Sequence, residues 1–352
     1  MSPERMDTSE TRRLQLTGGS TYTVSLPKKW VSEHGLKSKD EIRIEWRPSG
    51  NLRIIPEVTS LRKRRHFQIQ LDEIDDEFLL DYLIGAYLSG SELIRINSSS
   101  QFERSHRRSI RQFIQTTRGI EISNETDSSI EMIALLNSAE MPLHSSLNRM
   151  YLLVTSQVRD VLEVLCGGES NILEDCEERE KEVDALRLLL ERQVGQILES
   201  ASVETSFGTT RWEAAELSNI VRTLERMGDH CYILSKLAIS QDVPNILSKD
   251  SMPLSVMSIW QSSIKKLNAN LRIRNVKEIH EAKSEVTLAV LQLKEYEAIL
   301  WDSEIDSIDA LFLDKLSESL RRLLAYAQDM AEILINIHTH RNSEEVSYDL
   351  SN

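Results

Sequence analysis

The chain has 352 residues, of which 40% are hydrophobic, and a formal net charge of −14 at pH 7. This length allows two or three domains with sizeable cores. No run of about 18 apolar residues occurs, and the first residues lack the apolar segment of a secretory signal. We therefore expect a cytoplasmic protein that is not inserted in a membrane.

The charge is distributed unevenly along the chain. Residues 1–66 hold 14 lysines and arginines against 8 acidic residues, a net charge of +6, whereas the remainder holds 28 against 48, or −20. A basic head on an acidic body suggests that the head meets phosphate groups and that the body binds cations or basic partners. A basic patch that is simply solvated is the alternative.

The three cysteines, Cys166, Cys176 and Cys231, fall in segments that we predict to be helical and show no C-x-x-C spacing. We interpret them as reduced core residues, since this pattern fits neither a disulfide nor a thiolate metal site.

Alternating apolar residues predict two hairpins and a short helix in the head. The first hairpin turns at Gly18 and Gly19, the helix runs from Pro27 to about Gly35, and the second hairpin turns at residues 48–50. Glycine pairs and proline at these positions are typical of turns and of a first helical turn. A unit of this size buries little apolar surface alone.

The segments SLPKKW (25–30) and GLKSKDEI (35–42) resemble the pattern of AbrB-type swapped-hairpin domains. The resemblance covers about residues 12–56 and implies an obligate homodimer, because two chains interleave their hairpins in that family. It also implies contact with double-stranded DNA, although some members serve as antitoxins or only dimerise. The matching basic residues are Arg12, Arg13, Lys28, Lys29, Arg43, Arg47 and Arg53. With the basic run of residues 62–66, which adds DNA affinity or simply joins domains, we assign this domain to residues 1–66.

Residues 67–137 predict a small α/β domain. Their pattern gives the order βαβαββ, with helices on one face of a sheet. The strands are expected at 67–71, 92–96, 119–122 and 129–134, and the helices at 76–88 and 101–115. We find no chemistry in this domain, since the single Glu103-x-x-His106 has no second copy to complete a metal site.

From residue 141 onward the chain predicts helices only. Met141-Pro142-Leu143 recurs as Met252-Pro253-Leu254, so the segment repeats with a period of about 100 to 111 residues. Each copy predicts three antiparallel helices, at 142–165, 171–200 and 211–240 and at 253–273, 276–300 and 310–338. The expected fold is therefore a multidomain, mainly α protein whose last domains, at 138–241 and 242–342, are tandem three-helix bundles.

An acidic pair marks the third of these helices. Glu225 and Asp229 lie one turn apart, where two like charges repel by a few tenths of a kcal/mol unless a cation lies between them. Gly228 sits inside the helix, where it costs about 1 kcal/mol relative to Ala, so we expect a second helix or a ligand to approach closely there. Such acidic pairs are common on solvated helix faces, so the spacing alone is weak.

The string ERMGDH (225–230) resembles the signature of PhoU proteins, which regulate phosphate uptake and bind metal through Glu/Asp-x-x-x-Asp motifs on paired helices. The resemblance implies an upstream partner motif, which Glu180 and Asp184 supply. Glu180 also falls where the apolar stripe of its helix should continue, and a carboxylate there is costly unless it is paired or metal-bound. The expected metal ligands are Glu180, Asp184, Glu225 and Asp229. An ordinary ion-pair cluster with Arg179, Arg222 or Arg226 is the alternative.

The second copy departs from the motif. Ala325 stands where Glu225 would be, which leaves Asp329 on that helix and Glu281 and Glu285 on its partner. We expect one competent site in the first copy and, at most, a degenerate second site built from Glu281, Glu285 and Asp329.

Carboxylate oxygens suit magnesium, manganese or calcium and, in clusters, iron or zinc, so the expected cofactor is a divalent or trivalent metal ion. No P-loop, nucleophile triad or dinucleotide-binding turn occurs, and we expect no enzymatic activity. The sequence predicts a phosphate-responsive, DNA-binding regulator of phosphate uptake. The alternative is an adaptor that does not bind DNA and docks on the ATPase subunit of a phosphate transporter. A metal-dependent phosphatase is a weaker third idea.

Overall fold

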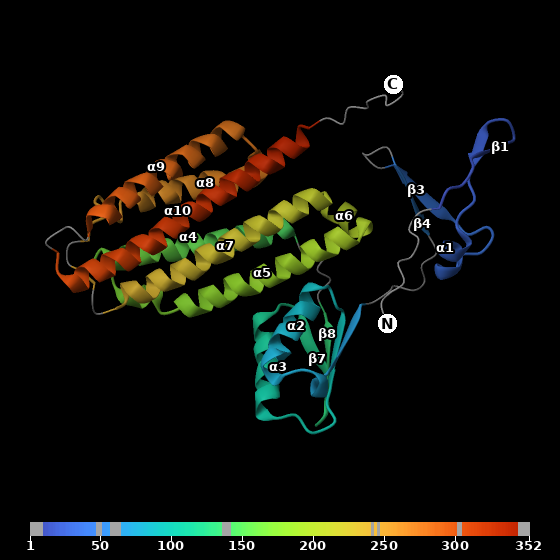
Figure 1. The fold of residues 1–352 in the computed structure, drawn as a ribbon, viewed down its shortest axis with the longest axis horizontal. Coiled ribbons are helices and arrows are strands. Elements are labelled where there is room, and N and C mark those ends of the chain that lie inside the picture. The colour runs from blue at the N-terminus through green and yellow to red at the C-terminus, as the bar shows by residue number, and fades with distance from the viewer. Residues whose placement is uncertain are drawn as a thin grey trace. The chain divides into compact units, whose positions relative to one another are not determined.

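The structure is a computed structural model that describes residues 10–46, 51–56, 65–135, 142–240, 243–244, 247–300 and 305–343. The chain separates into two compact units, Met1–Arg64 and Arg65–Asn352, which are described here one at a time. The predicted fold class is confirmed: small hairpins come first, then an α/β part, then long helices (Figure 1).

The first unit consists of two antiparallel hairpins and one short helix. Its elements are β1 (Gln15–Thr17), β2 (Thr21–Thr23), α1 (Lys28–Glu33), β3 (Ile42–Trp46) and β4 (Leu52–Pro56). Gly18 and Gly19 form the first turn with φ of 64° and 81°, a left-handed backbone that only glycine adopts without strain. Most apolar side chains of the two hairpins are exposed in the single chain, and none of the described residues of this unit is fully buried.

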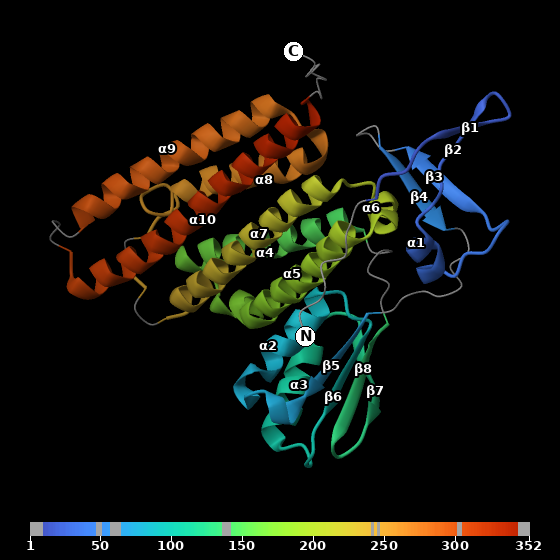
Figure 2. The same cartoon turned by 45° about the vertical axis from the view of Figure 1, so that its right-hand side comes forward.

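The second unit begins with the predicted βαβαββ layer, shown in Figure 2. Its elements are β5 (His66–Gln70), α2 (Leu79–Leu88), β6 (Leu93–Asn97), α3 (Arg104–Thr116), β7 (Ile120–Glu125) and β8 (Ser129–Ala134), with short 3-10 turns at Leu71–Glu73 and Asp76–Phe78. The sheet order is β5-β6-β8-β7, with the first pair parallel and the other two antiparallel. Residues buried on alternate positions of β6 and β8 face α2 and α3, and the other face of the sheet is more exposed.

The first helical bundle follows. It comprises α4 (Leu143–Leu165), a 3-10 turn at Ser170–Leu173, α5 (Cys176–Glu199), α6 (Ala201–Phe207) and α7 (Arg211–Ala238). The predicted spacing of apolar residues holds, since Val183, Leu186 and Leu190 of α5 pack in the same core as Leu217 and Leu224 of α7. The short helix α6 is not predicted by the sequence pattern.

The second bundle comprises α8 (Val256–Ile273), α9 (Val276–Leu300) and α10 (Ser307–Arg341). Helix α10 packs along α7, and both bundles share one continuous hydrophobic core (Figure 1). Trp260 is fully buried in this core, and its indole N–H donates to the Leu323 carbonyl oxygen at 3.0 Å.

Buried contacts fasten the α/β layer to the first bundle. Arg192 of α5 is 3% exposed, and it donates hydrogen bonds to the carbonyl oxygens of Tyr87 and Ser91. Its guanidinium carbon lies 4.8 Å from the centre of the Tyr87 ring, and Leu188 of α5 joins the core of the α/β layer. The layer and the bundle therefore share part of their packing.

No helix in the described ranges is long and apolar enough to cross a bilayer. The three cysteines are free thiols in the structure. Cys176 and Cys231 are buried, as predicted, but the prediction of a core position for Cys166 is wrong, because this residue follows the last turn of α4 and is exposed.

Candidate metal centre and nucleic-acid interface

Helices α5 and α7 approach closely at Gly228. A Cβ atom at this position would lie 3.1 Å from Cγ1 of Val183, which is tighter than ordinary van der Waals contact. The close approach of α5 therefore explains the glycine, because a side chain at this position would have to displace Val183. This close approach brings the two acidic motifs, one on each helix, to the same place.

Three of the four predicted metal ligands converge there. Glu180 and Asp184 of α5 and Asp229 of α7 each offer a carboxylate oxygen, and these oxygens lie within 4.8 Å of one another. Glu180 and Asp184 are partly buried, whereas Asp229 is exposed. Oxygens at this separation can share a hard cation, because coordination distances to carboxylates are roughly 2.0–2.6 Å.

Glu225, the fourth predicted ligand, is held by an arginine at the edge of the cluster. Nε of Arg187 lies 3.2 Å from its Oε1, at ion-pair distance but without hydrogen-bond geometry. Nη1 of Arg187 also lies 3.1 Å from Glu191, whose other oxygen is 2.8 Å from Nε of Arg222. Arg187 thus faces Glu225 and Glu191 and leaves the other three carboxylates without an ion pair among the described residues.

The pKa values of all four carboxyl groups are raised. Burial is the largest cause for each of them. The charge of Asp184 further raises the pKa of Glu180 and of Asp229, while Arg187 lowers the pKa of Asp184. Arg187 and Arg226 also lower the pKa values of Glu225 and Asp229, but all four values stay above the ordinary ones, so the charged form of the cluster is disfavoured in the metal-free protein and a bound cation would favour it.

The arginines proposed as alternative partners form no ion pair with the cluster, although the charge of Arg226 lowers the pKa of Glu225 and of Asp229. Arg179 pairs with Asp160 at 2.6 Å and with Asp175 at 2.8 Å. Arg222 pairs with Glu191, and Arg226 forms no ion pair within 4 Å in the described part of the chain. Arg187, which the sequence reasoning missed, is the arginine that contacts the cluster. Its position three residues after Asp184 was the available signal.

The residues of the expected second site are arranged differently. Glu285 receives hydrogen bonds from Nζ of Lys266 at 2.8 Å and from the Ser263 hydroxyl at 3.2 Å. The described residues contain no group of three ligand atoms that joins Glu285 to Glu281 and Asp329. The degenerate second site therefore stays a prediction, with a lysine already bound to one of its ligands.

His230 points away from the cluster. Its Nδ1 lies 3.4 Å from the Ser319 hydroxyl of α10, and its ring packs against Tyr326 with centroids 5.9 Å apart. Burial lowers the pKa of this imidazole, and Arg322 adds to that effect. These contacts fit a structural role between α7 and α10.

The predicted DNA-binding residues of the first unit fall into two groups. Arg13, Lys28 and Lys29 are exposed, and in the described ranges no carboxylate lies within ion-pair distance of them. Arg43 and Arg53 flank Glu45 at 3.9 and 3.6 Å, and Arg12 pairs with Glu10. Arg47 lies outside the described residues. The uncompensated positive charge therefore gathers near the start of α1 and before β1.

Comparison with known protein families confirms both resemblances. Residues 147–238 match the model of the PhoU domain, and residues 15–62 match that of the antidote-toxin recognition protein MazE, a bacterial antitoxin. The PhoU match covers the first bundle, with all four predicted metal ligands, and the MazE match covers both hairpins of the first unit.

The chain also matches a solved structure. The crystal structure of PhoU from Pseudomonas aeruginosa aligns with 58% of this chain and 99% of its own, at 19% identity and a TM-score of 0.45, a likeness too weak to carry an argument. No curated protein matches the chain.

Proposed function

We propose that this chain, with its MazE-type and PhoU segments, is a homodimeric, phosphate-responsive regulator of transcription that binds DNA and controls phosphate uptake. The observation that carries the proposal is the combination of a basic head, whose described residues are all at least partly exposed, with a cluster of three converging carboxylates in the PhoU segment. A regulator of transcription works where the DNA is, so the proposal implies a cytoplasmic protein, and it involves no catalysis.

The exposed apolar residues of the head support the dimer. Leu16, Tyr22 and Ile44 have exposed fractions of 59%, 67% and 53% in the single chain. Two-stranded hairpins are marginal in water alone, and exposed apolar strands are unpaired edges that another chain can cover. A second copy of the head would bury these side chains, as the swapped hairpins of the resembling family do.

The free cations of the head support DNA binding. Lys28 and Lys29 lie in the first turn of α1, and Arg13 precedes β1, with none of the three neutralised by a carboxylate among the described residues. Lysine and arginine contacts to phosphate supply most of the sequence-independent affinity for DNA. Such contacts position the protein without specifying the operator. In a dimer these residues would be present twice.

The carboxylate cluster supports a metal-binding regulatory body. Glu180, Asp184 and Asp229 would hold the ion, with Glu225 available if Arg187 moved aside. The donor set consists of carboxylates alone, which suits magnesium, manganese or calcium and, in clusters, iron or zinc. A bound ion would neutralise the repulsion between α5 and α7, and it could also bind phosphate directly.

A DNA titration at two salt concentrations tests the first half of the proposal. We expect tight binding that weakens steeply with salt. The slope of the logarithm of the binding constant against the logarithm of the salt concentration should be about 2 per chain smaller in magnitude in the Lys28→Gln/Lys29→Gln variant. The matched control is Lys277→Gln/Lys294→Gln, which removes the same charge from exposed positions of α9. No binding near physiological salt would favour the adaptor that docks on a transporter ATPase.

The response to phosphate is tested in cells. Immunoprecipitation of the protein from phosphate-replete and phosphate-starved cells, followed by sequencing of the attached DNA, should enrich promoters of phosphate-transport genes in one state more than in the other. Equal enrichment of unrelated sites in both states would contradict the proposed biology and leave the fold and the cluster unaffected.

A further inference from the structure

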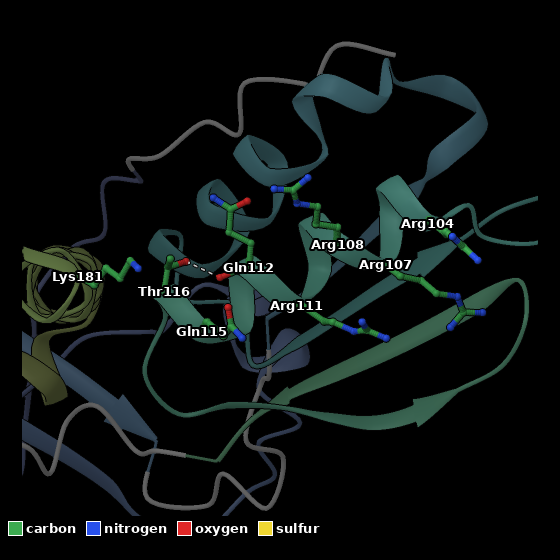
Figure 3. Close-up of a pocket in the computed structure, with 8 residues that line it drawn as sticks. All are labelled: Arg104, Arg107, Arg108, Arg111, Gln112, Gln115, Thr116 and Lys181. Atoms are coloured by element: carbon green, nitrogen blue, oxygen red, sulfur yellow. Dashed lines mark hydrogen bonds between the residues drawn. The ribbon is translucent and has the colours of Figure 1, made fainter. Parts of the chain in front are cut away.

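A strongly basic groove lies where the α/β layer meets the first bundle. It has a volume of about 780 Å³, and its lining includes four arginines of α3 and one lysine of α5: Arg104, Arg107, Arg108, Arg111 and Lys181. Figure 3 shows Arg104 and Arg107 toward one end of α3 and Lys181 beyond its other end. Residues about 70 positions apart in the sequence thus form one cationic surface.

The two walls of the groove belong to one packed body. Arg192 of α5 donates hydrogen bonds to the carbonyl oxygens of Tyr87, in the last turn of α2, and of Ser91, and Leu188 packs in the core of the α/β layer. Arg118, just after α3, lies 3.5 Å from Glu182 of α5. The groove therefore has fixed walls and is not a chance gap between separate domains.

Three of the five cations have no partner that would explain their clustering. Arg107 pairs with Glu125, and Lys181 pairs with Glu177 at 2.6 Å. Around Arg104, Arg108 and Arg111, no carboxylate of the described residues lies within 4 Å. Like charges three and four residues apart destabilise a helix by a few tenths of a kcal/mol per pair. A bound anion would offset the repulsion between these arginines.

The remaining lining specifies the kind of anion. Gln112, Gln115 and Thr116 add only amide and hydroxyl groups, and none of the described residues that line the groove is aromatic or aliphatic. A nucleoside or another hydrophobic group would find nothing to stack on. Guanidinium groups, by contrast, bind phosphate oxygens through two parallel hydrogen bonds.

The length of the basic row favours a chain of phosphates over a single one. From Arg104 to Arg111 the helix rises about 10 Å, at about 1.5 Å per residue. One orthophosphate can reach only part of this row, whereas several linked phosphate groups can contact successive arginines.

We propose that this groove binds a short linear phosphate chain, of which inorganic tripolyphosphate is the simplest example. The proposal goes beyond the proposed function and does not depend on DNA binding. Lys181 directly follows Glu180 of the carboxylate cluster, so an anion held by Lys181 would lie on the same helix as the metal ligands.

Calorimetric titration of the full-length, chelator-treated protein with tripolyphosphate tests the site, because chelation removes metal that the ligand could otherwise sequester. We expect saturable binding that is at least roughly tenfold weaker in the Arg108→Gln/Arg111→Gln variant, since each arginine loses charge-assisted hydrogen bonds. The control Lys277→Gln/Lys294→Gln has the same net charge change and should bind as the unaltered protein does. Orthophosphate should bind at least roughly tenfold more weakly than tripolyphosphate, because it reaches fewer arginines.

Three results would overturn the proposal. They are an absence of binding to the unaltered protein, an equal loss of affinity in the control variant, and equal affinity for orthophosphate. A parallel titration with duplex DNA separates this site from the head. If the arginine variant lost affinity for DNA while tripolyphosphate did not bind, the groove would be assigned to the DNA backbone and the phosphate-chain site would be rejected.

Discussion

Replacing Asp184 by Asn should have opposite effects on stability with and without metal. The side chain keeps its shape and loses its charge, and its oxygen lies within 4.8 Å of those of Glu180 and Asp229. Without metal, the change removes the cost of burying the charge of Asp184 and its repulsion of Glu180, Glu225 and Asp229, so it should stabilise the protein. With metal, it removes a ligand and should abolish most of the stabilisation that the ion provides.

The magnitude follows from the separation of the charges. Two unit charges 4.8 Å apart repel by about 0.9 kcal/mol in water and by about 3.5 kcal/mol at an effective dielectric constant of 20. The cluster is partly exposed, so the lower figure is the better guide, and Asp184→Asn should stabilise the metal-free protein by about 1–2 kcal/mol. A metal at 100 times its dissociation constant stabilises the unaltered protein by about 2.7 kcal/mol.

Thermal unfolding, followed by circular dichroism with chelator and then with excess manganese or magnesium, measures both effects. The melting temperature of Asp184→Asn should exceed that of the unaltered protein in chelator and fall below it in metal. Glu295→Gln is the control, because Glu295 is exposed on α9 and has no ion pair in the described ranges. If Asp184→Asn melted below the unaltered protein in chelator as well, Arg187 would already neutralise the cluster and the reasoning would fail.

Three further predictions concern pH, packing and assembly. The raised pKa values mean that Glu180, Asp184 and Asp229 bind more protons in the folded metal-free protein than in the unfolded chain, so their contribution to the free energy of unfolding should fall as pH rises from the ordinary carboxyl values of 3.8 and 4.5. The difference between pH series of urea titrations of the unaltered protein and of Asp184→Asn would show this fall. Gly228→Ala should weaken metal binding in calorimetry by pushing α5 from α7, whereas Gly85→Ala, with open space around it, should only stabilise, by roughly 0.5–1 kcal/mol. Ile44→Glu should yield monomers in analytical ultracentrifugation, and Ile299→Glu, at a residue that is also exposed but lies outside the head, should leave the dimer intact.

Most of the fold could be predicted because its signals are local. Apolar residues repeating every three or four positions identified the six long helices, and alternation identified the strands. The errors in the predicted helices also have local causes. The seven residues of α6 are too few to show a helical period, and the start of α10 was placed late because the capping side chain of Asp306, which accepts from the Ile308 N–H at 3.0 Å, was overlooked.

The site could be predicted only in part because it depends on the register between helices. The motifs predicted the acidic residues of the site, but the contact of Arg187 with Glu225 depends on how α5 packs against α7. The basic groove was missed for the same reason, since α3 and Lys181 meet only in the folded chain. In the head, the sequence identified the cations but not the pairing of Arg43 and Arg53 with Glu45.

The metal content of the purified protein tests the proposed centre most directly. Elemental analysis after dialysis against buffer with a divalent metal should find the ion retained in proportion to protein, and Asp184→Asn should lose it while Glu295→Gln keeps it. Retention of no metal by the unaltered protein, or equal retention by all three forms, would contradict a metal centre formed by Glu180, Asp184 and Asp229.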